Sequence, residues 1–70
     1  MRIQPDLAFE KHTYDQLKDA VVHYLQAHTR AQAADLKNAM GVSRKYAIPL
    51  LEYFDSNHIT KRVGDFRELA

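Results

Sequence analysis

Two short segments of the chain place cations where they could meet an anionic partner. One is the triplet Arg44-Lys45-Tyr46, and the other is the pair Lys61-Arg62. Neither segment contains an acidic residue, so each concentrates positive charge although the net charge of the chain is only +1. Local charge of this kind matters more for a contact with phosphate than the total charge does. The chemistry that these residues offer is binding of an anion.

The sequence lacks the patterns that catalysis or metal binding would require. It contains no cysteine, which excludes disulfide bonds and thiolate metal sites. Nucleophile motifs, Gly-rich phosphate loops and paired carboxylates are missing as well. The four histidines, His12, His23, His28 and His58, do not have the spacing of metal ligands, and we expect solvent-exposed or helix-end imidazoles. We therefore expect a binding domain with no enzymatic activity, no cofactor and no metal.

Length and composition limit the chain to one small folded domain. It has 70 residues, of which 46% are hydrophobic. No apolar run approaches the ~18 residues of a transmembrane helix, and the N-terminus does not have the pattern of a signal peptide. These features predict a cytoplasmic protein without a membrane partner. Residues 1–28 carry three cations and four anions, whereas residues 29–70 carry seven cations and five anions.

The elements that must position the cations begin with a helix. Residues 1–12 have no clear hydrophobic period, and we interpret them as an N-terminal arm or linker that precedes a domain at 13–70. Apolar residues then recur at helical spacing, which predicts a helix over 13–28. Thr13 and Gln16 have the form of a capping box at its start.

Two further helices follow in close succession. Residues 29–31 are expected to form a one-bridge strand, and residues 32–40 form the second helix. Gly41 suits the left-handed residue that ends a helix, and Val42 is expected to fill the angle between the helices. Ser43 is a favourable N-cap for the third helix. This order predicts a helix-turn-helix.

Pro49 lies inside the third helix, about six residues after its expected N-cap. A proline there has no amide hydrogen to offer the Lys45 carbonyl and costs roughly 3 kcal/mol if nothing compensates. We therefore expect a bend that separates residues 44–48 from the rest of the helix. The bend either aims the first turn at a ligand or is merely tolerated, and the sequence leaves both interpretations open.

A hairpin closes the chain. The third helix is expected to end near Asn57 and His58, and residues 59–63 and 66–69 read as strands joined by a tight turn at 64–65. The predicted fold is α+β, a winged helix-turn-helix with three helices and a small antiparallel sheet with a short wing. Eight apolar residues are expected in its core: Leu17, Val21, Leu25, Leu36, Leu50, Leu51, Phe54 and Val63.

A known family has similar sequences in the same two places. The segments Ser-Arg-Lys-Tyr-Ala-Ile-Pro-Leu-Leu-Glu-Tyr-Phe-Asp (43–55) and Ile-Thr-Lys-Arg-Val-Gly-Asp (59–65) resemble the last winged-helix domain of SelB, the bacterial selenocysteine-specific elongation factor. The resemblance spans about residues 30–70. The family usually has a glycine where this chain has His58, which makes the entry to the wing the least typical part.

The resemblance implies a function in protein biosynthesis. The family's C-terminal domains bind the messenger RNA hairpin, or SECIS hairpin, that directs selenocysteine incorporation at UGA, and they read a bulged uridine and a loop guanine. The family's GTPase domain has no counterpart here, so we expect a C-terminal fragment. Its expected partners are the hairpin and the preceding winged-helix domains of the parent chain, and we expect it to be a monomer.

The expected RNA-binding residues come from three elements. Arg44 and Lys45 lie in the first turn of the third helix, where free amides and the helix dipole attract phosphate. Tyr46 either stacks on a base or packs under the wing, and this choice stays open. Lys61 and Arg62 alternate along a strand, so only one of the two is expected to face the RNA unless the strand twists. The full expected set is Ser43, Arg44, Lys45, Tyr46, Arg62, Lys61, Arg30 and Gln32.

Two other binding functions are compatible with the sequence. A DNA-binding winged helix of a transcription regulator would read base edges with polar residues along its third helix. Here that face offers Ile48, Glu52, Tyr53 and Ser56, which is a poor set for base reading, and Glu52 would repel phosphate. The low net charge favours the second alternative, a winged helix that binds another protein.

Overall fold

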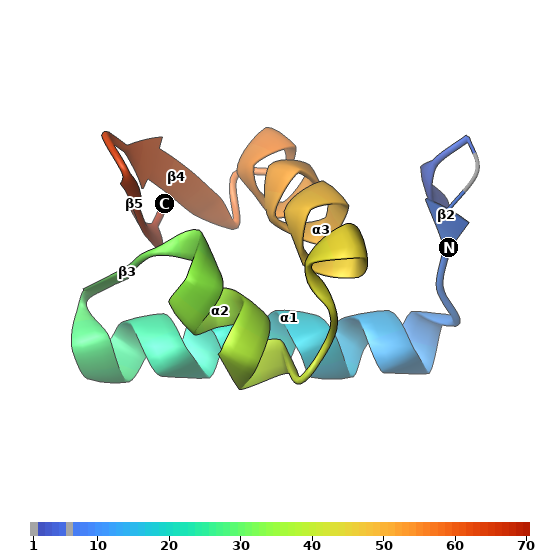
Figure 1. The fold of residues 1–70 in the computed structure, drawn as a ribbon, viewed down its shortest axis with the longest axis horizontal. Coiled ribbons are helices and arrows are strands. Elements are labelled where there is room, and N and C mark those ends of the chain that lie inside the picture. Colours follow the sequence, from blue (N-terminus) through green and yellow to red (C-terminus); the bar gives the residue numbers. More distant parts are fainter. Residues whose placement is uncertain (1, 6) are drawn as a thin grey trace.

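The computed structural model describes residues 2–5 and 7–70, and within them it has three helices and two small sheets (Figure 1). α1 runs along one side of the molecule, and α2 and α3 pack above it. The wing and a hairpin at the N-terminus lie on opposite sides of α3. This arrangement confirms the predicted α+β winged-helix fold. In chain order the elements are β1 (Arg2–Gln4), β2 (Leu7–Ala8), α1 (Lys11–His28), β3 (Arg30–Ala31), α2 (Ala33–Met40), α3 (Arg44–Ser56), β4 (Thr60–Val63) and β5 (Phe66–Leu69).

The start of α1 differs from the prediction. The helix begins at Lys11, two residues before the predicted start, and Glu10 rather than Thr13 is its N-cap residue. The capping box predicted at Thr13 and Gln16 is therefore wrong. Two contacts account for the earlier start: Lys11 Nζ lies 3.0 Å from Asp15 Oδ2, and the buried Tyr14 ring holds the first turn against α3. The hydrogen bond from Lys11 also lowers the pKa of Asp15.

The turn between α2 and α3 follows the prediction. Gly41 ends α2 with a φ of 70°, a left-handed conformation that glycine adopts without a Cβ penalty. Val42 is half-buried and packs against the core. Ser43 is the N-cap residue of α3, although its side chain makes no capping hydrogen bond. Its carbonyl accepts hydrogen bonds from the amides of Tyr46 and Ala47, both at 3.0 Å.

The wing is a three-stranded antiparallel sheet in the order β3-β5-β4. Its register pairs Arg62 with Arg67 and Lys61 with Glu68. At the entry to β4, His58 has a φ of 60°, so the chain makes a left-handed turn with a residue that favours it less than glycine. The Ile59 amide donates to the Phe54 carbonyl at 3.0 Å, which closes the end of α3.

One core residue was predicted on the wrong face. Val63 is 44% exposed, whereas Thr60 of the same strand is 1% exposed. Strand residues alternate between faces, and the face that carries Thr60 is the one turned toward α3. The remaining predicted core is buried, together with Tyr14, Ala31, Met40 and Ala47.

The N-terminal residues form a hairpin beside α3. β1 pairs with β2 in antiparallel register, and the Phe9 ring contacts Tyr46 edge to face, with 6.3 Å between ring centroids. Ile3 and Phe9 are half-buried against the core. Residues 11 and 12 are the first residues of α1. The division of the chain into an arm and a domain at residue 13 stays a proposal.

Candidate nucleic-acid interface

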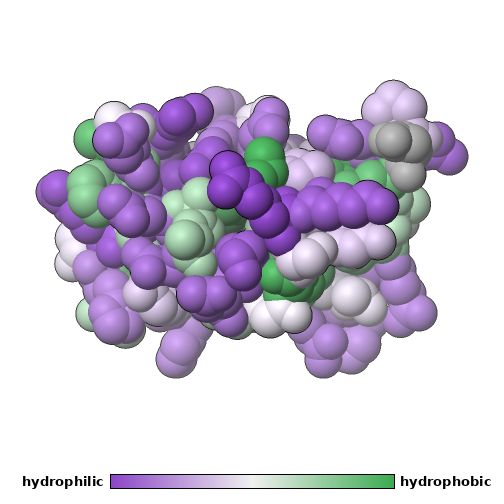
Figure 2. Space-filling view, in the orientation of Figure 1, coloured by the Kyte–Doolittle hydropathy of each residue, from purple (hydrophilic) through white to green (hydrophobic). Residues whose placement is uncertain are grey.

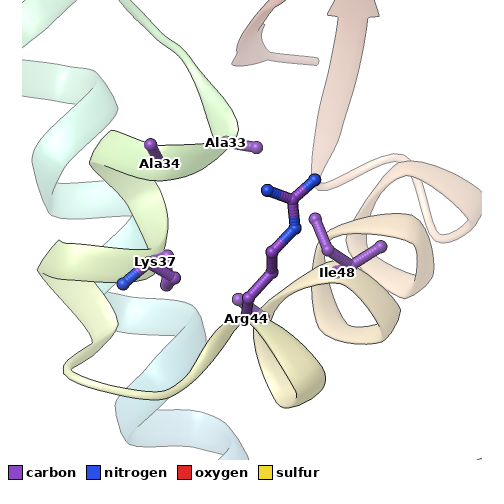
Figure 3. A pocket seen from close by; sticks show the side chains of 6 residues that line it. Ala33, Ala34, Lys37, Arg44 and Ile48 are labelled. Carbon is purple, nitrogen blue, oxygen red and sulfur yellow. The ribbon is translucent and has the colours of Figure 1, made fainter.

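Arg44 lines a hollow of the surface between α2 and α3. It is exposed in the first turn of α3, and its guanidinium extends between Ala33 at the start of α2 and Ile48 (Figure 3). The pocket there has a volume of about 90 Å³, and it is lined by Ala33, Ala34, Lys37, Arg44, Ala47 and Ile48. Within the described residues, no carboxylate pairs with Arg44. Its charge is therefore available to a ligand.

The same hollow continues as a groove between α3 and the wing. We call it the α3–wing groove, and it is lined by Ala33, Arg44, Ile48, Glu52, Asp55, Ser56, Arg62 and Arg67. Arg62 is exposed at its wing side, where its Nε donates to the Gly64 carbonyl at 3.3 Å. The visible face is mostly hydrophilic with small apolar areas among the polar side chains (Figure 2). A groove bordered by three guanidinium groups, Arg44, Arg62 and Arg67, suits an anionic ligand.

Lys45 and Tyr46 point to the other side of α3. They line a shallow pocket with Pro49 and with Gln4, Leu7 and Ala8 of the N-terminal hairpin. Lys45 Nζ lies 5.7 Å from the centre of the Tyr46 ring, and that ring is 39% exposed although Phe9 contacts it. Tyr46 therefore packs against the hairpin, not under the wing, and part of its ring remains accessible.

Arg30 and Lys61 lie on the outer face of the sheet, away from the groove. Glu68 lies between them, 3.7 Å from Arg30 Nη2 and 4.0 Å from Lys61 Nζ. The Arg30 guanidinium also lies over the Phe66 ring, 5.5 Å from its centre. Partial pairing with Glu68 lowers the positive charge that this face presents.

Gln32 and Ser43 stand at the starts of the two helices of the helix-turn-helix. Both are exposed. The backbone amide of Gln32 donates to Asp35 Oδ2 at 3.1 Å, so Asp35 caps α2. The eight predicted residues thus divide among the groove, the hairpin side of α3, the outer sheet face and the two helix starts.

Sequence reasoning missed two cations that line the hollow, Lys37 and Arg67. Lys37 lies on α2 and borders the Arg44 pocket. Arg67 is the cross-strand partner of Arg62, and strand alternation could have placed it on the same face as Arg62 once the register was known. Neither residue belongs to the two acid-free segments at 44–46 and 61–62.

Other kinds of site are not found in the part of the chain that the structure describes. It holds no group of three histidine or acidic side chains arranged to bind a metal ion. None of its helices is both long and apolar enough to cross a membrane. Burial raises the pKa of Tyr14, but this residue lies in the core between α1 and α3 and lines neither the groove nor the hairpin pocket.

Comparison with known proteins identifies the family. A family model described as "Elongation factor SelB, winged helix" matches residues 23–69, which include the helix-turn-helix, the wing and every lining residue of the α3–wing groove. The chain belongs to the SelB winged-helix family. It is also 28% identical over 69 residues to a selenocysteine-specific elongation factor from Desulfomicrobium baculatum.

The alignment covers 99% of this chain but only 11% of that SelB protein. The N-terminal hairpin and the start of α1 precede the part that the SelB family model matches, yet the relative aligns with them as well. A winged-helix domain of an elongation factor is a binding module, and the groove and the first turn of α3 are the surfaces on which its cations gather.

Proposed function

We propose that this SelB domain is an RNA-binding module that recognises a messenger RNA hairpin and so directs selenocysteine incorporation at UGA during translation. The proposal includes action in the cytoplasm, as a monomeric part of a longer chain whose other winged-helix domains precede it. Its contacts with RNA come from Ser43, Arg44, Lys45, Tyr46, Arg62, Lys61, Arg30 and Gln32.

The observation that carries the proposal is the position of Arg44. Its guanidinium lies in a hollow between α2 and α3 without a carboxylate partner among the described residues. The first turn of α3 adds free backbone amides and the positive end of the helix dipole. For folding alone, a cation at a helix N-terminus is mildly unfavourable, and a local conflict of this kind is typical of a binding site.

The surroundings of Arg44 support RNA over DNA as the ligand. Beyond the first turn, the groove face of α3 offers Ile48, Glu52 and Ser56, which cannot supply the paired donors and acceptors that read a major groove. A-form RNA hides its bases in a deep, narrow groove, and proteins instead bind its backbone and its unstacked bases. Arg44 and the half-open Tyr46 ring suit these two kinds of contact.

A titration of the domain with three ligands tests the proposal. The ligands are a bulged RNA hairpin, the same hairpin sequence as duplex DNA, and the RNA with its bulge deleted. The bulged RNA should bind most tightly, because it alone combines an A-form backbone with the bulged base. Equal binding of the DNA would favour a DNA-binding winged helix, and failure to bind all three would favour a protein partner.

A further inference from the structure

Arg67 of β5 is held by a carboxylate in the wall of the α3–wing groove. Its side chain is only 10% exposed, and both Nε and Nη2 lie 3.2 Å from Asp55 Oδ2. Asp55 is fixed in turn, because the hydroxyl of Thr60 donates to its Oδ1 at 2.6 Å. The three residues join the end of α3 to both strands of the wing hairpin, so the direction of the Arg67 guanidinium is set before any ligand arrives.

The rest of the Arg67 guanidinium is open to the groove. A guanidinium has five N–H donors, and Asp55 engages only the Nε–Nη2 edge. The structure gives the Arg67 side chain no other partner among the described residues. Those residues also include no buried side-chain nitrogen or oxygen without a partner. Nη1 of Arg67 is therefore not fully buried, and the groove that this residue lines is the surface on which it can meet a ligand.

Two further guanidinium groups border the same groove. Arg62 lies directly opposite Arg67 in the antiparallel register, and Arg44 reaches the groove from α3. Like charges placed directly opposite each other destabilise a sheet, and Asp55 compensates only one of the three cations. Glu52, which also lines the groove, carries a negative charge. The positive charge of the groove is therefore located at Arg44, Arg62 and Arg67 and does not extend along its whole length.

We propose that Arg44, Arg62 and Arg67 form one binding site for a backbone phosphate of a nucleic acid, with Asp55 as the positioning residue of Arg67. Arginine suits this task because its planar donors match the oxygens of a phosphate. The inference rests on the proposed function, since it names the group of the RNA that the groove would bind. It adds a residue, Arg67, whose burial would otherwise suggest a purely structural role.

The test uses the full chain with Arg67→Lys, and Arg2→Lys serves as the matched control, because Arg2 is exposed on β1 and does not line the groove. Lysine keeps the positive charge and the ion pair with Asp55, but it lacks the additional N–H donors with which the guanidinium would bind a phosphate. We expect Arg67→Lys to weaken binding of the bulged RNA hairpin by about 5- to 10-fold, with thermal melting close to that of the unmodified chain. Arg2→Lys should bind the hairpin within about twofold of the unmodified chain. Unchanged affinity of a folded Arg67→Lys variant would overturn the inference.

A second measurement uses the unmodified chain, so it does not depend on the folding of a variant. In the unmodified chain, inorganic pyrophosphate should shift the NMR side-chain signals of Arg44, Arg62 and Arg67, while those of Arg2 stay in place. If the hairpin fails to bind but pyrophosphate produces these shifts, the proposed function fails and the phosphate site stands. If neither pyrophosphate nor the hairpin shifts the Arg67 signals, the phosphate site is wrong.

Discussion

Arg44 and Lys61 carry the same charge in different surroundings. Arg44 reaches into a pocket without an acidic partner among the described residues. Lys61 shares Glu68 with Arg30 on the outer face of the sheet. A phosphate that binds Arg44 meets an uncompensated cation, whereas one that binds Lys61 must compete with a carboxylate. The two residues should therefore differ in their contribution to RNA binding.

Replacement of Arg44 by alanine tests this difference. Arg44→Ala should weaken binding of the bulged RNA hairpin by ~1–3 kcal/mol, the scale of a specific charged contact. Because the side chain is exposed and has no acidic partner among the described residues, the melting temperature should change little. Lys61→Ala is the control and should cost less affinity. A melted Arg44→Ala domain, or one that binds as well as the unmodified chain, would contradict the position assigned to Arg44.

Glu52 should have the opposite effect on binding. It is exposed in the same groove as Arg44 and Arg62, where its charge repels phosphate. Glu52→Gln should strengthen hairpin binding by up to about 1 kcal/mol, the scale of an exposed charge interaction. Isothermal titration at low salt measures the change, and Glu10→Gln, at the N-terminus of α1, is the control. Unchanged binding by Glu52→Gln would mean that the RNA does not enter the groove.

Among the elements, α3 stands between two structures that depend on it. The wing is tied to its C-terminal end through Asp55, and the N-terminal hairpin contacts its first half near Tyr46 and Pro49. The helix continues across Pro49 from Arg44 to Ser56. Both Pro49 and the N-terminal hairpin can therefore affect the direction of the first turn of α3.

Replacement of Pro49 tests separately its effect on the stability of the domain and its effect on RNA binding. Pro49→Ala restores the amide that can pair with the Lys45 carbonyl, so the domain should gain up to about 3 kcal/mol in unfolding free energy. If Pro49 directs the first turn at the RNA, the same variant should bind the hairpin more weakly. Chemical denaturation and a binding titration measure the two effects. Higher stability with unchanged affinity would make the proline a tolerated feature, and lower stability would show that its ring is needed for packing against the hairpin.

Removal of residues 1–9 tests the N-terminal hairpin as an element. The truncated chain loses the half-buried Ile3 and Phe9 side chains, and we expect a loss of about 1–3 kcal/mol in unfolding free energy. Tyr46 should become more exposed, which acrylamide quenching of tyrosine fluorescence can detect. Phe9→Leu is the control, because it keeps most of the apolar contact. An unchanged melting temperature after truncation would support the interpretation of these residues as an arm outside the domain.

For the whole molecule, the distribution of charge matters more than its sum. The net charge is only +1, yet Arg44, Arg62 and Arg67 share one groove, with Lys37 next to it. Asp55 and Glu52 offset part of this charge on the same surface. The domain should therefore bind RNA with moderate affinity, through a limited number of phosphate contacts.

The salt dependence of binding should report the number of phosphate contacts. If about four phosphates are neutralised, the slope of log affinity against log salt should be about −3 to −4. Arg44→Ala should reduce the slope by about one unit, whereas Glu52→Gln should not reduce it. A slope near zero with intact binding would exclude backbone contacts and would favour a protein partner.

Local signals in the sequence determined the order of the elements and the turns between them. Gly41 predicted the end of α2, Ser43 the start of α3, and the turn at 64–65 the wing, because each depends on the conformation of one or two residues. Helical spacing identified Leu25, Leu36 and Phe54 as core for a similar reason. The acid-free triplet at 44–46 also marked the first turn of α3 as a candidate binding surface, because residue type alone sets its charge.

Only the tertiary structure decided which faces these elements turn toward one another. Alternation along β4 separates Thr60 from Val63 but cannot tell which of them is buried, because that depends on Asp55 of another element. The same long-range contact orients Arg67, and pairing with Glu68 sets Lys61 apart from the groove. Local sequence specifies conformation over a few residues, whereas contacts between distant segments form only when the chain packs.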